Sequence, residues 1–375
     1  MSAPREAPPR DVLGVITAIG AVTSVGRGAA ASCAAIRAGI SRPRRVSHFQ
    51  VLEPETQDTV PLTAHPIQGY TDGFVGMGRW LRLARGCLGE VLETPGLPRP
   101  SDARFWDRAG LLMVIPSRDD GLFELEGDDG LEGIREDCLR PLLDALGLAL
   151  PDAKVWVVDQ GPAGTATAVQ QASGELWRAG FERVLVLAVD SLVDPEALRM
   201  LDEEGRLKVG DNPVGLMPGE AGACFLLEQE EAVRRRGAAP LALVTGVATA
   251  EERLHLYAGH VSQGAGLAAC LREVLARGPV PARFEGDLYS DLNGEEWRAR
   301  EWGTALVRLG DALGAHGVQL PCVSVGDVGA ASGALGVCLS VHAFTRGHSR
   351  TAQSLVVSSS PWGAVGCLRL HSTGA

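Results

Sequence analysis

The stretch Pro218-Gly-Glu-Ala-Gly-Ala-Cys-Phe-Leu-Leu-Glu228 decides the fold class, because it joins a glycine-rich turn to a continuous apolar run. A run of this kind, Ala223–Leu227, is typical of a strand in a sheet that is covered on both faces. Gly219 and Gly222 precede the run and allow a close approach of another backbone or a positive φ. The stretch therefore predicts a central strand of a layered α/β domain.

Nine further apolar runs predict strands, and the ten runs fall into two successive groups of five. The first group is Val12–Ile19, Gly110–Ile115, Lys154–Val158, Arg183–Val189 and Ala223–Leu227. The second group is Leu241–Ala248, Asp287–Leu292, Pro321–Val325, Ser354–Ser358 and Gly366–His371. Helix-like stretches separate most runs of the first group, which predicts right-handed crossovers. The equal strand counts favour a duplicated architecture, with residues 11–238 and 239–375 as two halves and residues 1–10 as a flexible tail.

Six motifs, spread in order over nearly the whole chain, carry small residues next to predicted strands and helices. They are Val15–Gly26, Cys33–Gly39, Ala188–Ser191, Pro218–Glu228, Gly326–Gly336 and Ser358–Gly366. Together these motifs resemble those of the β-ketoacyl synthases. The resemblance implies a thiolase-like α/β fold, in which two similar halves form a five-layered α-β-α-β-α architecture. It also implies dimerisation through the sheet edge near the strand at Lys154–Asp159.

The same resemblance implies that the catalytic residues of the family are missing. β-Ketoacyl synthases use a cysteine thiolate to hold the acyl chain and two histidines to assist decarboxylation. The segment Gln160–Ala172 aligns with the nucleophile motif and places Pro162 at the cysteine position. Proline has neither a thiol nor the backbone N–H that would contribute to an oxyanion hole. A shift of two residues would place Gln160 there, which restores the N–H but supplies no thiolate.

Both histidine positions differ as well. Asn293 stands where the first histidine motif is expected, and Asp327 follows Gly326 where the second is expected. The chain is therefore similar to a degenerate family member that lacks the Cys-His-His triad. The nearest precedent is the chain-length-factor subunit of type II polyketide synthases.

Five polar or aromatic residues are expected to surround the three triad positions in a vestigial pocket. They are Asp159, Asp291, Glu295, Ser359 and Trp362. Carboxylates gathered in a half-buried cleft could raise one pKa and provide acid–base chemistry. Alternatively, they cap helices and satisfy backbone groups around a filled pocket, as Asp327 would do before an Ala/Gly-rich helix. We expect neither a metal ion nor a cofactor.

Composition limits the partners and the compartment. The chain has 375 residues and a formal net charge of −11, which argues against nucleic-acid binding. The compact basic run Arg234–Arg236 is expected to be a solvated helix end. Eight scattered cysteines without a C-x-x-C pair predict buried, reduced thiols. No apolar run reaches the roughly 20 residues needed to span a membrane, and no secretory signal is found, so the cytoplasm is the expected compartment.

Three functions remain open at this point. The first is a pseudoenzyme without condensing activity that acts as a dimeric binding subunit, as a homodimer or as a heterodimer with an active ketosynthase. An acyl carrier protein is then a candidate partner. The second is a cysteine-independent decarboxylase or acyltransferase for acyl thioesters. The third is an adaptor in a larger assembly such as a secretion apparatus, with Asp119–Asp137 and the segment around Trp297 and Trp302 as candidate contact surfaces. Gln50–Gly73 and Asp119–Asp137 are expected to form surface insertions or loops.

Overall fold

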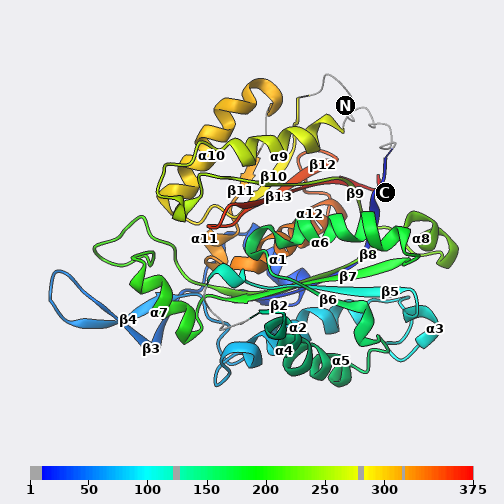
Figure 1. Ribbon diagram of the computed structural model, residues 1–375, viewed down its shortest axis with the longest axis horizontal. Helices are drawn as coiled ribbons and strands as arrows, with labels where there is room; N and C mark the ends of the chain where they lie inside the picture. The colour runs from blue at the N-terminus through cyan, green and yellow to red at the C-terminus, as the bar shows by residue number, and fades with distance from the viewer. Residues whose placement is uncertain (1–10, 121–126, 278–282, 315–316, 375) are drawn as a thin grey trace.

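One mixed β-sheet of eleven strands runs through the protein (Figure 1). The computed structural model describes residues 11–120, 127–277, 283–314 and 317–374, so the tail predicted at residues 1–10 lies outside the described residues. The strands of the first half are β1 (Gly14–Thr23), β2 (Gly26–Arg27), β5 (Ala109–Val114), β6 (Val155–Val158), β7 (Arg183–Ser191) and β8 (Glu220–Glu228). Those of the second half are β9 (Ala242–Glu251), β10 (Asp287–Ser290), β11 (Gly317–Gln319), β12 (Gln353–Ser359) and β13 (Ala364–Ser372).

The two halves repeat the same strand order. The order is β6-β5-β7-β8-β1 in the first half and β11-β10-β12-β13-β9 in the second, with the short β2 paired to β1 off this path. The first three strands of each order are parallel to one another. The fourth strand, β8 or β13, runs antiparallel to the third, and the fifth, β1 or β9, runs antiparallel to the fourth. β1 joins β9 antiparallel, from Gly14 opposite Val244 to Ile16 opposite Ala242. The two similar halves are thereby confirmed, and their residue boundaries stay a prediction.

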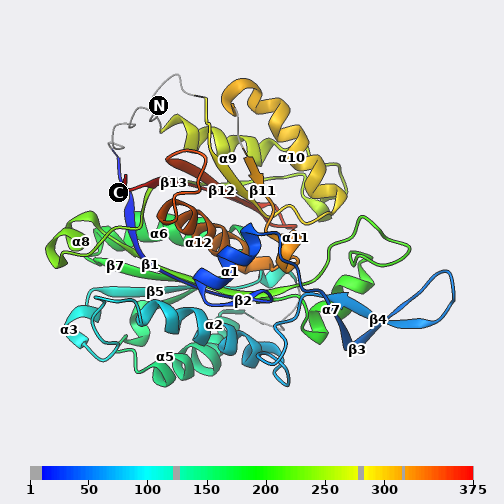
Figure 2. The same ribbon diagram turned by 180° about the vertical axis from the view of Figure 1, so that it is seen from behind.

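Helices form three layers around these strands (Figures 1 and 2). Two helices cover the outer face of the second half, α9 (Ala265–Ala276) and α10 (Glu296–Leu309). The outer face of the first half is covered by α2 (Gly76–Leu92), α4 (Gly127–Ile134) and α5 (Arg140–Leu146), and α1 (Ala29–Arg37), α6 (Gly164–Gln171) and α12 (Ser332–Thr345) lie between the halves. Three further helices connect strands at the periphery, α3 (Ala103–Trp106), α7 (Pro195–Glu203) and α8 (Glu230–Arg236). The predicted α-β-α-β-α order is confirmed.

The central helix α12 is buried all round, and small residues let it approach its neighbours. Ten of its fourteen residues are buried, as expected for a helix without a polar face. A Cβ atom added at Gly333 would lie 2.8 Å from the side chain of Thr165, and one at Gly336 would lie 2.7 Å from Val356. Both contacts are too short for a larger residue, so these glycines serve packing.

One predicted strand is wrong. Pro321–Val325 forms the helical turn α11 (Cys322–Val325), and the strand at this edge is β11 instead. Pro321 has a helical backbone, with φ −57° and ψ −30°, and its carbonyl accepts the amides of Ser324 and Val325. Because proline lacks the N–H that a ladder needs, it starts a helical turn here more readily than a strand.

The surface segments are more ordered than the loops predicted for them. Within Gln50–Gly73, β4 (Thr59–Ala64) pairs antiparallel with β3 (Arg44–Leu52) as a separate two-stranded sheet. The acidic segment Asp119–Asp137 is helical from the start of α4, and its residues 121–126 lie outside the described residues. All eight cysteines are free thiols, and seven of them are buried as predicted. Across the described ranges, the helices are too short or too polar to cross a membrane.

Candidate functional site

Pro162 lies in a buried turn at the start of α6. Gly161, Pro162 and Ala163 form a 3₁₀ turn shortly after β6, and Gly161 has a φ of 53°, which favours glycine. The amide of Gly161 donates to the carbonyl of Ile115 (3.1 Å). On its other side the turn packs against α12, where a Cβ atom added at Gly333 would lie 3.3 Å from the Pro162 carbonyl oxygen. The turn therefore meets the N-terminal end of α12.

Asp327 holds the same end of α12. Its Oδ1 accepts the amide of Gly329 (2.8 Å), the first residue of the 3₁₀ turn that leads into the helix. Its backbone N–H donates to the carbonyl of Met217 (2.8 Å), and its carbonyl accepts the amide of Gly219 (2.8 Å). The structure thus shows Asp327 in the capping role that was one of the two alternatives for it.

Asn293 joins Asp327 to Glu295 through its side-chain amide. Nδ2 donates to Asp327 Oδ2 (2.6 Å) and to Glu295 Oε2 (2.7 Å), while Oδ1 accepts the backbone N–H of Glu295 (3.0 Å). All three residues are buried. Asn293 therefore has both N–H donors and its carbonyl engaged by groups of this chain.

A buried ion pair encloses this cluster. Arg206 donates from Nε and Nη2 to the two carboxylate oxygens of Glu295 (2.8 and 3.0 Å), and from Nη1 to the hydroxyl of Tyr257 (3.1 Å). Burial alone would raise the pKa of Glu295, but the charge and hydrogen bonds of Arg206 hold that pKa below its ordinary value. The ring of Tyr257 stacks on Trp362, with centroids 4.1 Å apart. Glu295 is therefore ionised, and Trp362 lies beside the cluster in contact with Tyr257.

A second set of buried charges lies at the end of β12. Asp291 pairs with Arg298 (2.5 Å), and its Oδ2 also accepts the amide of Ser359 (2.8 Å). The hydroxyl of Ser359 donates to the carboxyl group of Glu301. Burial raises the pKa of Glu301 to about 7, although the Ser359 hydrogen bond and the charge of Arg298 oppose this rise. Glu301 therefore titrates near neutral pH.

The guanidinium of Arg298 connects the two sets. Burial alone would lower its pKa, but the negative charges of Asp291, Asp327 and Glu295 raise that pKa above its ordinary value. Asp291, Asp327 and Glu295 thus surround one cation. Burial also raises the pKa of Asp291, against the opposing charge of Arg298.

A thiol also lies beside these carboxylates. Cys322 donates from Sγ to the carbonyl oxygen of Leu292 (2.7 Å). Burial, followed by the negative charges of Asp327 and Asp291, raises the pKa of Cys322 to about 12. Because a reactive cysteine needs a lowered pKa, Cys322 remains a protonated thiol at neutral pH.

The free space beside these groups is small. A cavity lined by Tyr289, Asp291, Val328 and Ser332, among others, has a volume of about 20 Å³, which holds about one water molecule. In the described part of the chain, no group of three or more His, Cys, Asp or Glu side chains is placed to hold a metal ion. The carboxylates of the site are therefore paired around a nearly filled interior, whereas the Nε atom of Arg298 is buried without a hydrogen-bond partner among the described residues.

Most of the predicted pocket residues come together, but Asp159 does not join them. Asp291, Glu295 and Ser359 belong to the buried network, and Trp362 lies next to it. Asp159 instead pairs with Arg118, whose side chain is 43% exposed. The side chain of Asp159 is itself only 16% exposed and is engaged by this ion pair.

Four residues of the network are absent from the sequence-based prediction, namely Arg206, Tyr257, Arg298 and Glu301. Arg298 and Glu301 could have been found, because they continue the buried face of α10 that includes Ala305. Charged residues on a buried helical face signal a polar network. Arg206 and Tyr257 give no local signal, since the contact between them and the contact of Arg206 with Glu295 join residues far apart in the sequence.

The tryptophans of α10, suggested as part of a contact surface for an adaptor, are only partly exposed. Trp297 and Trp302 are both half-buried. Trp302 packs against the hydrophobic core between α9, α10 and the sheet. The guanidinium of Arg298 lies 4.7 Å from the centroid of the Trp297 ring. Trp302 thus supports the core, whereas Trp297 also lines a cavity of about 250 Å³.

Comparison with known proteins relates the chain to ketosynthases by structure. No family model and no curated protein matches the sequence. A type II polyketide ketosynthase, solved with its acyl-carrier protein and bound to a hexaketide, superposes with a TM-score of 0.75 at 15% identity, over 98% of this chain and 100% of that one. The ishigamide ketosynthase/chain length factor superposes with a TM-score of 0.71 at 19% identity, over 96% of this chain and 98% of that one. The module 6 ketosynthase of the Bacillus subtilis bacillaene synthase superposes with a TM-score of 0.72 at 14% identity, over 96% of this chain and 72% of that one. The chain therefore has the thiolase-like fold of the ketosynthases.

Proposed function

We propose that this protein is a ketosynthase-like pseudoenzyme, which does not catalyse condensation and acts as a dimeric binding subunit. The observation that carries the proposal is Pro162 in the turn at the start of α6. The sequence motif aligns the family's nucleophile with this position, where proline offers no thiolate and no N–H for an oxyanion hole. Losing one oxyanion donor alone typically costs about 2.7–4 kcal/mol of transition-state stabilisation.

The groups at the two histidine positions support the same proposal. Histidines there would donate hydrogen bonds to a developing enolate oxygen. The N–H donors of Asn293 are instead engaged by Asp327 and Glu295. Asp327 is an acceptor that caps the turn before α12. These groups therefore hold the fold together and leave no donor for a substrate.

The free edge of the sheet supplies the surface for a partner. β6 is the last strand of the ladder, so one of its edges has no partner strand in the described part of the chain. We place the dimer contact along Lys154–Asp159, between two copies or with an active ketosynthase, and propose an acyl carrier protein as a further partner. Structures similar to this chain include a ketosynthase/chain length factor and a ketosynthase with its carrier protein. Each subunit comprises halves 11–238 and 239–375 and acts in the cytoplasm.

Two measurements test this proposal together. Size-exclusion chromatography with light scattering at micromolar concentration should show a dimer, either alone or after mixing with a ketosynthase from the same source. Malonyl and acyl thioesters incubated with the purified chain should yield no condensation product. A monomer in both mixtures, or condensation by the chain alone, would overturn the proposal.

One observation favours a second function, a cysteine-independent reaction of acyl thioesters. Glu301 accepts a hydrogen bond from the Ser359 hydroxyl, and burial raises its pKa to about 7, which suits a general base at neutral pH. Carbon dioxide release from a malonyl thioester that is lost in Glu301→Gln but kept in Glu296→Gln would support this function. Glu296 is a matched control, because its carboxylate is exposed on the same helix. If the parent chain releases no carbon dioxide, this second function is rejected.

A further inference from the structure

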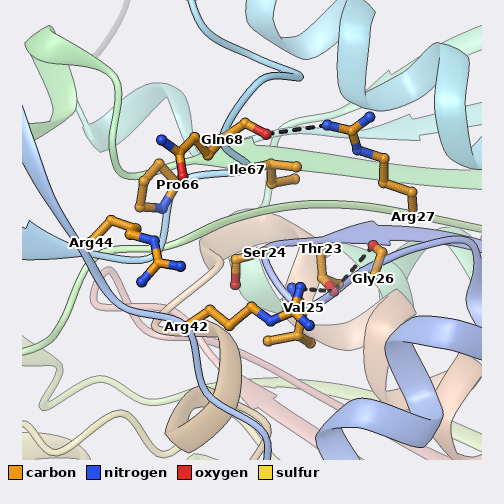
Figure 3. A pocket seen from close by; sticks show the side chains of 10 residues that line it. All are labelled: Thr23, Ser24, Val25, Gly26, Arg27, Arg42, Arg44, Pro66, Ile67 and Gln68. Atoms are coloured by element: carbon orange, nitrogen blue, oxygen red, sulfur yellow. Dashed lines mark hydrogen bonds between the residues drawn. The ribbon is translucent and has the colours of Figure 1, made fainter.

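The fold gathers three arginines around a cavity near the end of β1. The cavity has a volume of about 350 Å³ and is lined by the turn Thr23–Arg27, by Arg42 and Arg44 at the start of β3, and by Pro66–Gln68 after β4 (Figure 3). An adjoining cavity of about 360 Å³ shares Arg44, Pro66 and Gln68 and adds Arg45 and His48. Sites for small molecules typically measure about 300–1,000 Å³, so this space suits a small ligand.

Two of these arginines lack the carboxylate partners that neutralise the compact basic run. The side chains of Arg234–Arg236, on α8, pair with Glu230, Glu231, Glu182 and Glu228. In the described ranges, by contrast, Arg42 makes no hydrogen bond or ion pair, and Arg44 donates only to the carbonyl of Pro43 (3.4 Å). The positive charges of Arg234–Arg236, expected from the sequence at a solvated helix end, are thus neutralised by glutamates. Arg42 and Arg44 instead keep free N–H donors at the cavity.

A hydroxyl group without a partner lies next to them. The Oγ atom of Ser24 is buried and has no hydrogen-bond partner among the residues that the structure describes. In the view of Figure 3 it lies between the guanidinium groups of Arg42 and Arg44. A buried hydroxyl without a partner is unfavourable, and an anion held between the two arginines would accept its hydrogen bond.

The walls of the cavity leave its positive charge uncompensated. Arg27 donates to the carbonyl of Gln68 (3.2 Å), a neutral acceptor, and lies over the ring of Tyr70. Asp72 lines the adjoining cavity, where its carboxylate accepts the amide of Gly69 (2.8 Å). Arg79 lines the same cavity and is committed to Glu220. A cleft lined by one sign of charge attracts an oppositely charged ligand even on a chain of net charge −11.

We propose that this cavity binds the phosphate group of a small phosphorylated ligand. The planar guanidinium groups of Arg42 and Arg44 match the geometry of phosphate oxygens, and each can donate two hydrogen bonds. The Ser24 hydroxyl supplies a further donor, and Arg27 adds charge at the wall. The site lies apart from the Asn293–Asp327 cluster and requires no condensing activity.

Isothermal titration with inorganic pyrophosphate as the probe tests this site on the full chain. We expect saturable binding with one site per chain, which weakens as salt concentration rises because the charges are exposed. The double variant Arg42→Gln/Arg44→Gln should weaken binding by roughly ten- to a hundredfold, and Ser24→Ala by about tenfold, since each removes a hydrogen bond to a charged group. Arg253→Gln is the matched control, because Arg253 is exposed and lies outside both cavities. Its affinity should equal that of the parent chain.

Several outcomes would overturn the proposal. They are the absence of saturable heat at millimolar pyrophosphate, an unchanged affinity in the double variant, and an equal loss of affinity in Arg253→Gln. Acetate that competes as strongly as inorganic phosphate would also reject the phosphate class. Thermal unfolding of each variant shows whether the fold is kept, which is expected because the substituted arginines are exposed.

Discussion

The amide of Asn293 donates to the carboxylate of Asp327 across 2.6 Å, although 34 residues separate them in the chain. The other oxygen of Asp327 accepts the amide of Gly329 in the 3₁₀ turn before α12, and the amide of Asn293 also donates to Glu295. This bond therefore ties the loop after β10 to the central helix. In the proposed alignment Asn293 and Asp327 stand at the two histidine positions of a condensing enzyme, and the bond between them supports the fold.

Removing the carboxylate of Asp327 should destabilise the protein. Asp327→Ala deletes the cap at Gly329 and leaves a buried donor of Asn293 unpaired, which should lower the free energy of unfolding by about 2–4 kcal/mol. Urea unfolding measures this change. Asp311→Ala is the control, because Asp311 is 89% exposed in its pair with Arg283 and should change stability by less than about 0.5 kcal/mol. Equal effects of the two substitutions would contradict the role of Asp327.

The ion pair of Arg206 with Glu295 should be costly to break from one side. Arg206→Met leaves an ionised carboxylate buried without its cation and should cost about 3–5 kcal/mol of unfolding free energy. The double variant Arg206→Met/Glu295→Leu removes both charges and should recover part of that loss, although the amide of Asn293 then loses its acceptor on Glu295. Denaturant unfolding of the single and double variants measures the coupling. If the loss of stability in the double variant equals the sum of the losses in Arg206→Met and Glu295→Leu, the two residues do not act as a pair.

Much of the fold could be predicted because both faces of the sheet are covered. β7 and β8 are continuous apolar runs, and this pattern identifies them without knowledge of their neighbours. Pro321–Val325 misled the prediction because an apolar run of five residues suits a buried helical turn as well as a strand. The apolar pattern alone could not distinguish the two.

The candidate site could be predicted in part only. Motif order singled out Pro162, Asn293 and Asp327, and in the structure Asn293 contacts Asp327 while the turn of Pro162 packs against α12; their equivalence to the triad stays a prediction. The partners that hold them could not be found in this way, since Arg206 and Glu295 lie 89 residues apart and no local period relates them. Asp159 was misplaced because the residues around a turn can direct a side chain either inward or toward the surface.

Glu301 should make stability depend on pH. Burial raises its pKa from 4.5 to about 7, so the folded protein holds this proton more tightly than the unfolded chain. The stabilising contribution is fully present below about pH 4.5 and is lost as the pH rises through about 7. Glu301→Gln has no proton to lose, so its stability lacks this pH dependence. The free energy of unfolding of the variant minus that of the parent should therefore increase by on the order of 3 kcal/mol between about pH 4.5 and about pH 8. Urea unfolding at both pH values checks this, and a constant difference between the two proteins would refute it.

The two terminal strands of the ladder provide a matched test of the dimer edge. β6 and β11 occupy equivalent positions in the two halves, and each carries a valine that is not fully buried, Val157 and Val318. Val157→Arg places a charge in the proposed contact and should weaken association of the dimer by about tenfold or more, because a buried unpaired charge is strongly unfavourable. Val318→Arg should leave association unchanged, since β11 lies at the opposite end of the ladder. Light scattering over a dilution series measures both, and loss of the dimer in Val318→Arg but not in Val157→Arg would place the contact at β11.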